Sequence, residues 1–318
     1  MIDAFIKLFQ DVHLWLFEQL VQPLLFATDN MALADDTFDG LEWMLIGLVE
    51  IVFLALVLRS IERRWPLEPI ADRKAIRTDL IYTLLHRLGA FGLITFALLS
   101  AQVDQIAAWL HLQGVTPFNL EQLWPGVTDI PWVSFAVYFV VLDCVDYWVH
   151  RGQHRFNWWW SLHALHHSQR QMTLWSDDRN HLLDDLLRDV LMASVALCIG
   201  VAPGQYIGLI VASRVQQSLQ HANLKCSFGR WGEWLLVSPR FHRVHHAIGL
   251  GHEGATRGCN FAVLLPIWDI LFGTADFRDE YPATGIRDQL SGREYGQGFW
   301  QQQWLGIKRL LSTRNSNA

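Results

Sequence analysis

The stretch PWVSFAVYFVVLDCVDYWVHRGQH, residues 131–154, joins an apolar run to the first of several groups of histidines. A helix that crosses a bilayer needs about 20 mainly apolar residues, and the run Pro131–Val149 meets this requirement. Two further stretches, Leu41–Leu58 and Leu80–Leu99, meet it as well. The sequence therefore predicts an all-α, polytopic membrane protein with three spans.

The overall composition agrees with a membrane protein. Of the 318 residues, 51% are hydrophobic and 16 are tryptophan. The net charge is −6 and no run of lysines occurs, so the basic surface that a nucleic-acid-binding protein needs is missing. The four cysteines never form a CxxC motif, which argues against a zinc ribbon or a disulfide scaffold. We expect a membrane protein with free thiols and no nucleic-acid partner.

Two other apolar regions do not fit a single span. Residues Phe5–Ala27 are interrupted by charged side chains such as Lys7, and we expect an amphipathic helix that lies in the membrane interface. Residues Leu186–Leu219 are too long for one span and are broken at Pro203–Gly204, where the proline ends a helix. This second region is predicted to form a helical hairpin that enters and leaves the membrane on one side.

The distribution of lysine and arginine predicts the orientation, because short cytoplasmic loops are enriched in them. Residues 59–77 carry six, whereas residues 28–42 and 100–130 carry none. Everything after Val149 is then expected on the cytosolic face of a bacterial inner membrane or the endoplasmic reticulum. The predicted segments are an interfacial helix with the first two spans (1–129), a catalytic domain (130–280) and a cytosolic C-terminal tail (281–318).

Eight histidines fall into three groups with helical spacing: HRGQH (150–154), HALHH (163–167) and HRVHH (242–246). Positions three and four apart share one face of a helix, so each group is expected to aim its imidazoles at one point. Imidazole nitrogens suit zinc, copper, iron and nickel. Eight of them exceed the four ligands of a structural zinc, which favours a two-metal site. The predicted metal ligands are His150, His154, His163, His166, His167, His242, His245 and His246, with His221 as a ninth.

The remaining histidines have a simpler interpretation. A lone histidine is more often a core or surface residue than a ligand, and we interpret His13, His86, His111 and His252 in this way. His181 is also left outside the ligand set. The three groups do not allow this interpretation, because eight polar rings beside membrane spans would be costly to bury unless something bound them.

Acidic residues near the end of the third span are candidates for supporting the metal ligands. Asp143, Asp146 and His150 follow i, i+3, i+7 spacing, and a carboxylate can accept the second N–H of a ligand histidine and fix its tautomer. The alternative for Asp146 is an ion pair with Arg151 or Arg155. No ExxH pair of the ferritin-like type occurs among the histidine groups. The candidate catalytic residues are Asp143, Asp146 and Asn223.

Aromatic and basic residues near these groups suggest contacts with the membrane. Trp148 and the run Trp158–Trp160 lie where the third span ends, as in an aromatic belt at a membrane surface. Arg240 and Arg243 flank the last histidine group. They are expected to dock an acidic electron carrier or a lipid head group, or to anchor the chain at the membrane surface.

The motifs DCVDYWVHRGQH, SLHALHHS, SPRFHRVHH and CNFAVLLPIWDILFGT, in this order, resemble the fatty acid hydroxylase and sterol desaturase superfamily over residues 130–280. By this resemblance the eight grouped histidines and His221 are metal ligands. The resemblance implies two iron ions, with zinc as a possible substitute in purified protein. It also implies O2-dependent hydroxylation or desaturation of a lipid drawn from the bilayer, which would be a sterol, a fatty acyl chain, a carotenoid or an ether lipid. Since no haem or flavin domain is recognised, electrons are expected from a separate donor protein.

Two other classes of protein are considered. A membrane zinc-dependent hydrolase would activate water on its metal, but hydrolases usually add a carboxylate base beside the ligands, as in HExxH, and the three motifs lack it. A non-catalytic metal-binding or transport protein would distribute its ligands through the spans. The histidines are instead expected together at the cytosolic end of the spans.

Overall fold

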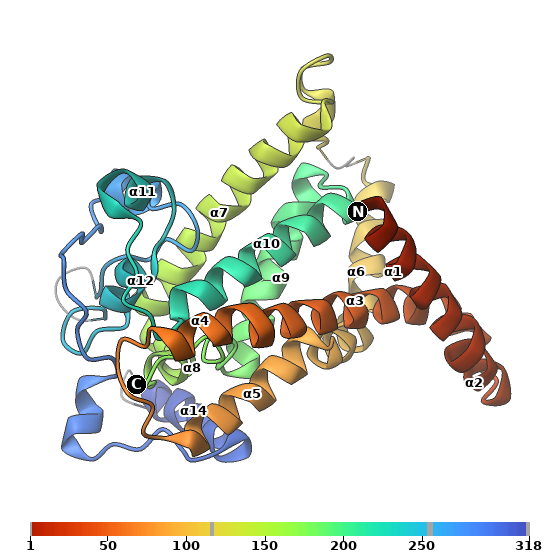
Figure 1. The fold of residues 1–318 in the computed structure, drawn as a ribbon. Coiled ribbons are helices and arrows are strands. Elements are labelled where there is room, and N and C mark those ends of the chain that lie inside the picture. Colours follow the sequence, from red (N-terminus) through yellow and green to blue (C-terminus); the bar gives the residue numbers. More distant parts are fainter. Residues whose placement is uncertain (1, 115–117, 253–256, 316–318) are drawn as a thin grey trace.

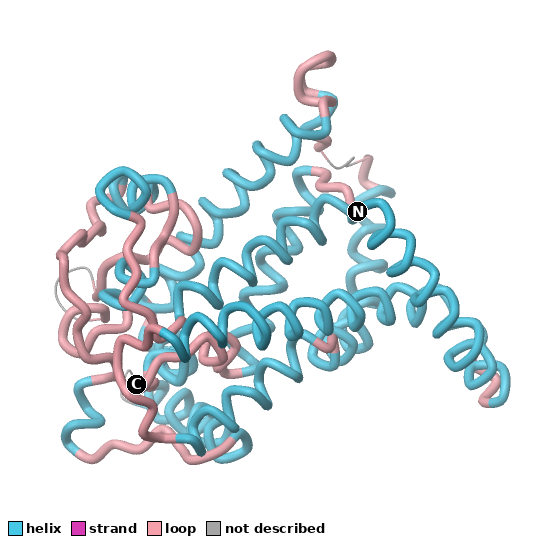
Figure 2. The backbone as a smooth tube through the Cα atoms, in the orientation of Figure 1, coloured by secondary structure: helices cyan, strands magenta, loops and turns pink. Residues whose placement is uncertain are grey.

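The computed structural model describes residues 2–114, 118–252 and 257–315. Over these residues the chain is helical and forms no β-strand, with only isolated bridges between residues such as Pro66 and Leu224. The long helices gather into a bundle, and most loops lie together at one end of it (Figures 1 and 2). The prediction of an all-α protein is confirmed for the part of the chain that is described.

The first and third predicted spans lie in long, apolar helices. The first lies within Met31–Arg64, a rod of 34 residues, and the third within α7 (Pro131–Arg155), which has 25. Both helices are long and apolar enough to cross a membrane. The rod consists of a 3-10 turn (Met31–Leu33), α3 (Ala34–Phe53), a π-helical turn (Leu54–Leu58) and α4 (Arg59–Arg64).

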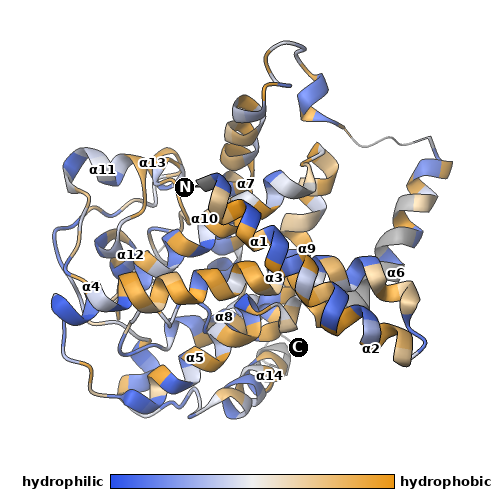
Figure 3. Ribbon diagram, turned by 45° about the vertical axis from the view of Figure 1, so that its right-hand side comes forward, coloured by the Kyte–Doolittle hydropathy of each residue, from blue (hydrophilic) through white to orange (hydrophobic). Residues whose placement is uncertain are grey.

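The rod has an apolar outer surface. Leu48, Val52 and Leu56 are 47%, 47% and 68% exposed. Figure 3 shows hydrophobic residues along most of α3. A large exposed apolar surface of this kind is typical of a helix that contacts lipid or another protein.

The prediction that Leu80–Leu99 forms a single spanning helix is wrong. Helix α5 (Arg73–Arg87) ends inside it, and α6 (Ala90–Leu112) begins after a break. Gly89 in the break has φ of +77°, a left-handed conformation that glycine adopts without steric strain. The end of α5 is also polar, because the side chain of Arg87 is buried among carboxylates and does not face lipid.

The predicted helical hairpin is present as two consecutive helices. Its arms are α9 (Leu182–Ile199) and α10 (Pro203–His221), and the turn between them contains Gly200 with φ of +74°. The arms lie beside α7 (Figure 1). Tyr138 and Leu142 of α7 form an apolar core with Ala196 and Leu209 of the two arms. This core fixes the arm that ends at His221 against the helix that carries the first histidine group.

The N-terminal segment is helical, as predicted. It consists of α1 (Ile2–Leu16), a π-helical turn (Phe17–Val21) and α2 (Gln22–Ala27), and it projects from the bundle (Figure 1). Its location in the membrane interface stays a prediction.

Short helices and loops form the end of the bundle where the histidines lie. Helix α8 (Asn157–His167) follows α7 directly, and α14 (Phe299–Asn315) packs against it. The other elements here are α11 (Gly229–Leu235), α12 (Pro239–His245), α13 (Ile267–Leu271) and the 3-10 helix Arg287–Ser291, while the 3-10 helix Leu120–Gln122 precedes α7. Helix α12 has seven residues and begins at Pro239, a residue type that is favoured at the first helical position. Its three histidines therefore occupy its last turn and its C-cap.

Candidate metal centre

All nine predicted ligand histidines come together at this end of the bundle, in two groups. Within each group, one ring nitrogen from every member lies within 4.8 Å of the others. We call them the five-histidine group and the four-histidine group. The five-histidine group contains His150, His154, His163, His167 and His245, and the four-histidine group contains His166, His221, His242 and His246.

Each HxxHH motif divides between the two groups. In the motif 163–167 the first and last histidines join the five-histidine group, and His166 joins the other. In the motif 242–246 the first and last join the four-histidine group, and His245 joins the other. The expectation that each motif aims at one point is therefore wrong for these two motifs, whereas it holds for His150 and His154, which join the same group. At 3.6 residues per turn, the side chain at i+4 is rotated by about 40° about the helix axis from that at i. The side chain at i+3 is rotated by about 60° in the opposite direction.

Hydrogen bonds fix the protonation of two rings in the five-histidine group. Nδ1 of His150 lies 2.7 Å from the backbone oxygen of Phe261, and Nδ1 of His245 lies 2.7 Å from that of Cys259. A carbonyl oxygen only accepts, so Nδ1 carries the proton in both rings. Each Nε2 atom is then an unprotonated donor of an electron pair, as a metal ligand must be.

A carboxylate orients a third ring of this group. Nδ1 of His163 donates to Oδ2 of Asp184 at 2.9 Å. Oδ1 of the same carboxylate accepts from Gln153 at 2.8 Å and from the indole of Trp159 at 2.6 Å. Trp159 is therefore a buried partner of the centre and not the membrane anchor expected from the sequence. Asp184 is therefore the carboxylate partner of a ligand histidine, a role that was expected for Asp143 and Asp146 of α7.

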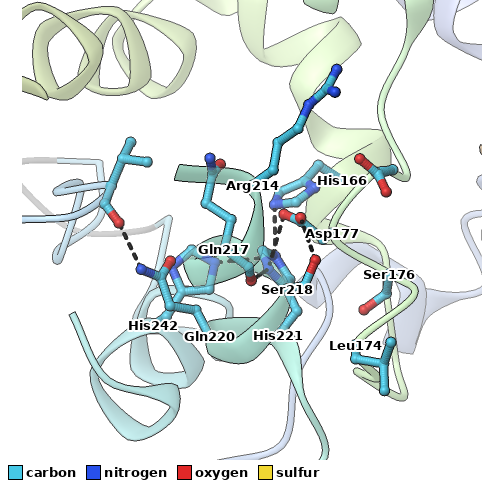
Figure 4. Close-up of polar contacts among 12 residues, drawn as sticks. His166, Leu174, Ser176, Asp177, Arg214, Gln217, Ser218, Gln220, His221 and His242 are labelled. Atoms are coloured by element: carbon cyan, nitrogen blue, oxygen red, sulfur yellow. Dashed lines mark hydrogen bonds and ion pairs between the residues drawn. The ribbon is translucent and has the colours of Figure 1, made fainter. Parts of the chain in front are cut away.

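In the four-histidine group, Nε2 atoms from all four rings lie close to one another. Nε2 of His221 lies 3.2 Å from Nε2 of His166 and 3.1 Å from Nε2 of His242, and Nε2 of His246 lies 3.1 Å from that of His242. Figure 4 shows His166, His221 and His242 converging from different elements. Nδ1 of His221 donates to the backbone oxygen of Gln217 at 2.8 Å, so its Nε2 atom is again unprotonated.

The donor set fits a metal ion in each group. Both ring nitrogens of His154 and His167 and Nε2 of His163 and His245 are buried without a hydrogen-bond partner, an arrangement that is costly unless another group binds them. Burial lowers the pKa of His245 to about 3, and burial with the neighbouring rings holds the pKa of His246 well below its usual value. Neutral, convergent imidazoles are ligands for iron, zinc or copper and poor ligands for magnesium or calcium.

The contacts of Asp143 and Asp146 correct the role expected for them. Asp143 accepts from the backbone N–H groups of residues 264–265, both at 3.0 Å, and from the indole of Trp268 in α13 at 2.8 Å. Asp146 pairs with Arg188 of α9 at 2.8 and 2.5 Å. Neither carboxylate has a hydrogen bond to a ligand histidine among these contacts. Both join α7 to its neighbours and orient no ring.

Asn223 and His181 also make structural contacts. Asn223 donates to the backbone oxygen of Glu68 at 2.7 Å and accepts from its N–H at 3.1 Å, which holds the loop after α4 against the end of α10. Nδ1 of His181 accepts from the N–H of Leu183 at the start of α9, and its other nitrogen donates to the backbone oxygen of Gln303. His181 lies outside both groups, as expected.

The two arginines beside the last motif are not free to dock a partner. Arg240 is 9% exposed and pairs with Glu233 and Asp279. Arg243 is 4% exposed and pairs with Glu68 at 3.0 Å. The sequence had suggested docking or membrane anchoring for these arginines. Both interpretations are wrong, because the two guanidinium groups form internal ion pairs.

Two carboxylates that contact ligand rings were not predicted from the sequence. They are Asp184, described above, and Asp177, whose Oδ1 lies 3.3 Å from Nδ1 of His221. Both belong to the acidic stretch 177–185 that surrounds His181. The stretch is visible in the sequence, but nothing local indicates which of its carboxylates points inward.

A cavity of about 910 Å³ opens beside the centre. Ligand histidines such as His166 and His242 line one part of it, and apolar side chains such as Leu93, Met192 and Leu209 line another. Pockets of 300–1,000 Å³ with apolar walls and a few polar groups are typical of sites for small organic ligands.

Comparison with known proteins agrees with this geometry. Residues 135–274 match the model of the fatty acid hydroxylase family. The matched segment is thus similar to fatty acid hydroxylases. It lies inside the predicted catalytic domain, 130–280, whose boundaries stay a prediction. No solved structure matches the chain.

Several similar proteins have names that describe enzymes acting on lipids. The chain is 32% identical to alkylglycerol monooxygenase of Xenopus tropicalis over 181 residues, which cover 55% of this chain and 39% of that protein. It is 30% identical to the Homo sapiens enzyme over 51% of this chain and 35% of that protein. It is 27% identical to the Delta(7)-sterol 5(6)-desaturase erg3C of Aspergillus fumigatus over 39% of this chain and 46% of that protein. The chain thus spans less than half the length of each of these relatives.

Proposed function

We propose that the protein is a membrane-bound di-iron oxygenase that carries out O2-dependent hydroxylation or desaturation of a lipid. The observation that carries the proposal is the convergence of nine buried histidines in two adjacent groups at the wall of a large cavity. The match to the fatty acid hydroxylase family and the monooxygenase and desaturase relatives support the same reaction class.

One metal ion would be held by the five-histidine group and one by the four-histidine group. When bound, iron supplies the O2 chemistry that removes hydrogen from an unactivated C–H bond. The protein orients the ligands through the carbonyl groups of Cys259 and Phe261 and the carboxylate of Asp184. Burial of the rings keeps bulk water away from the reacting centre. Zinc is expected to replace iron in some preparations, because imidazole ligands suit both metals.

The cavity is the proposed site of the lipid. Its apolar wall, which includes Leu93, Met192 and Leu209, suits a hydrocarbon chain, while the histidine wall faces the carbon to be oxidised. Sterols, fatty acyl chains, carotenoids and ether lipids are the candidate substrates. Ether lipids are the first to assay, since two relatives are named for alkylglycerol.

We further propose that the rod Met31–Arg64 and α7 cross the bilayer in the same direction, with α5 and α6 returning the chain between them. The metal centre would then lie on the cytosolic face of a bacterial inner membrane or the endoplasmic reticulum. The basic residues 59–77 at the end of the rod, and the absence of lysine and arginine from residues 28–42, support this orientation. Electrons would reach the centre from a separate donor protein on that side.

Metal analysis tests the proposal directly. Full-length protein from iron-replete cells should contain about two irons per chain, with the Mössbauer signature of nitrogen-ligated iron. His166→Ala and His245→Ala each remove a ligand from a different group. Each variant should therefore lose mainly one iron, and the double variant should lose both. The proposal would be contradicted if wild-type protein bound one metal ion or none and if the metal content were the same in the variants.

The source of oxygen in the product separates the oxygenase from a zinc-dependent hydrolase. The assay supplies an ether lipid, a reductant and 18O2, and mass spectrometry follows the label. An oxygenase transfers 18O from O2 into a hydroxylated product. Label that enters only from H2(18)O, in a reaction that needs no O2 or reductant, would indicate hydrolysis instead.

A further inference from the structure

A buried ionic cluster lies next to the four-histidine group, on the side away from α12. Arg87 at the end of α5 is at its centre and is 1% exposed. Its guanidinium donates to Asp178 at 3.0 Å, to Asp177 at 3.2 Å and to the hydroxyl of Ser218 at 2.7 Å, and lies 3.4 Å from Glu50. One side chain therefore links α3, α5, α10 and the loop before α9.

Asp177 connects this cluster to a metal ligand. Its Oδ2 atom accepts from Arg87 and, at 3.2 Å, from the hydroxyl of Ser218. Its Oδ1 atom is turned the other way and lies 3.3 Å from Nδ1 of His221 (Figure 4). Nε2 of the same ring belongs to the four-histidine group. The carboxylate is thus held on one side by Arg87 and Ser218 and faces the protonated nitrogen of a ligand on the other.

The fold enforces the position of Arg87. A Cβ atom at Gly47 would lie 1.6 Å from the backbone oxygen of Arg87, so α3 and α5 can approach this closely only because residue 47 is glycine. One turn later on α3, Glu50 is 3% exposed and reaches the guanidinium. The helix contact fixes the backbone at Arg87, and the contacts with Glu50, Asp178 and Ser218 hold its guanidinium beside Asp177.

We propose that Asp177, held by Arg87 and Ser218, is a positioning residue for the metal of the four-histidine group. It helps to hold the orientation of His221, whose tautomer the carbonyl of Gln217 sets, and it supplies a negative charge beside this group. Asp184 has the corresponding place at the five-histidine group, through His163. The inference rests on the proposed function, because it requires a metal in each group.

The same two elements provide a matched control. Asp79 of α5 pairs with Arg179 of the loop before α9 at 2.5 Å, and the two residues are 1% and 6% exposed. This pair resembles Asp177–Arg87 in burial and location, but its described contacts include no ligand histidine. Asp79→Asn therefore perturbs the loop without touching His221.

The experiment measures the affinity for Zn2+ of the metal-free, full-length protein in detergent, by competition with a chromophoric chelator. Zinc is used because it has no redox chemistry. Wild-type protein should bind two ions. Asp177→Asn should weaken one of them about 10- to 100-fold, the range found when a partner of a ligand histidine is removed, and leave the other unchanged. Asp79→Asn should leave both affinities unchanged.

Double variants identify the affected ion. Asp177→Asn added to His221→Ala, which removes the ring that Asp177 contacts, should weaken binding little beyond His221→Ala alone, whereas added to His245→Ala it should weaken both ions. If Asp177→Asn does not fold, Ser218→Ala replaces it, and the same ion should be weakened by a smaller factor.

Three results would overturn the inference. They are two unchanged affinities in Asp177→Asn or its replacement, an equal loss in Asp79→Asn, and additive losses when Asp177→Asn is combined with His221→Ala. Wild-type protein that binds fewer than two ions would instead defeat the proposed function, and the inference with it.

Discussion

Replacing Asp184 by asparagine should remove His163 as a metal ligand without removing any histidine. In the structure, one oxygen of Asp184 accepts from Gln153 and Trp159, and the other accepts from Nδ1 of His163. Asparagine has one acceptor and one donor in these places. If its oxygen faced His163, its NH2 group would meet two donors, those of Gln153 and Trp159. Its NH2 group is therefore expected to face His163.

This orientation forces a change of tautomer in the ring. Two opposed N–H groups left buried would cost about 1–3 kcal/mol, and His163 avoids this by moving its proton from Nδ1 to Nε2. The Nε2 atom then has no electron pair for a metal. We expect the ion of the five-histidine group to bind about 10- to 100-fold more weakly, which corresponds to about 1.4–2.7 kcal/mol.

The assay compares zinc affinities of Asp184→Asn, His163→Ala and the double variant in full-length protein. Because both single changes act through the same ring, the double variant should be no weaker than His163→Ala within a factor of about two, which is the limit of additivity for independent sites. Wild-type affinity in Asp184→Asn would refute the tautomer argument. Additive losses would show that Asp184 acts through some other contact.

Three further predictions concern packing and the carboxylates of α7. Gly47→Ala should destabilise the protein by about 1–3 kcal/mol or more, seen as a lower Tm, because its Cβ would overlap the backbone of Arg87; Gly40→Ala, whose Cβ would meet a leucine methyl at 3.2 Å, should cost less. Asp143→Ala should cost about 3 kcal/mol by stranding two backbone N–H groups and an indole, but retain both metals. Asp146→Asn should also retain both metals in metal analysis, and loss of either would restore the role first expected for this residue.

Much of the helical architecture follows from local features of the sequence. The length and apolar character of Pro131–Val149 predict α7, and the proline at position 203 predicts the turn between α9 and α10. These predictions need only the residues of the element itself, because hydrophobic length and the missing N–H of proline act locally.

The error in the second span has a different origin. Hydropathy averages over a window, and Leu80–Leu99 is apolar on average even though it contains Arg87. Whether such an arginine faces lipid or carboxylates depends on Glu50, Asp177 and Asp178, which come from other parts of the chain. The break at Gly89 and the burial of Arg87 therefore depend on tertiary contacts, which a local hydropathy average does not include.

The convergence of the nine histidines was predictable, but their division into two groups and their carboxylate partners were not. Histidines at i, i+3 and i+4 are recognisable by their spacing, since the face they share is a property of the helix alone. The i, i+3, i+7 spacing of Asp143, Asp146 and His150 looked equally good, but the carbonyl of Phe261 already takes the N–H of His150. The carboxylate that does orient a ring, Asp184, is 21 residues from its partner, so only the packing of α8 against α9 brings them together.

The division of each HxxHH motif explains why the spacing matters to a two-metal site. A pair at i and i+4 can serve one ion, and the histidine at i+3 points to the other side of the helix face, toward the second ion. Helix α8 gives two rings to the five-histidine group and one to the other, and the motif of α12 does the reverse. The two groups therefore share both helices. His167 and His246, from different groups, stack with ring centroids 4.4 Å apart, so helix geometry and ring contact set the spacing of the two groups. A rotation of either helix would displace rings of both groups at once, so the fold holds the two groups in place together.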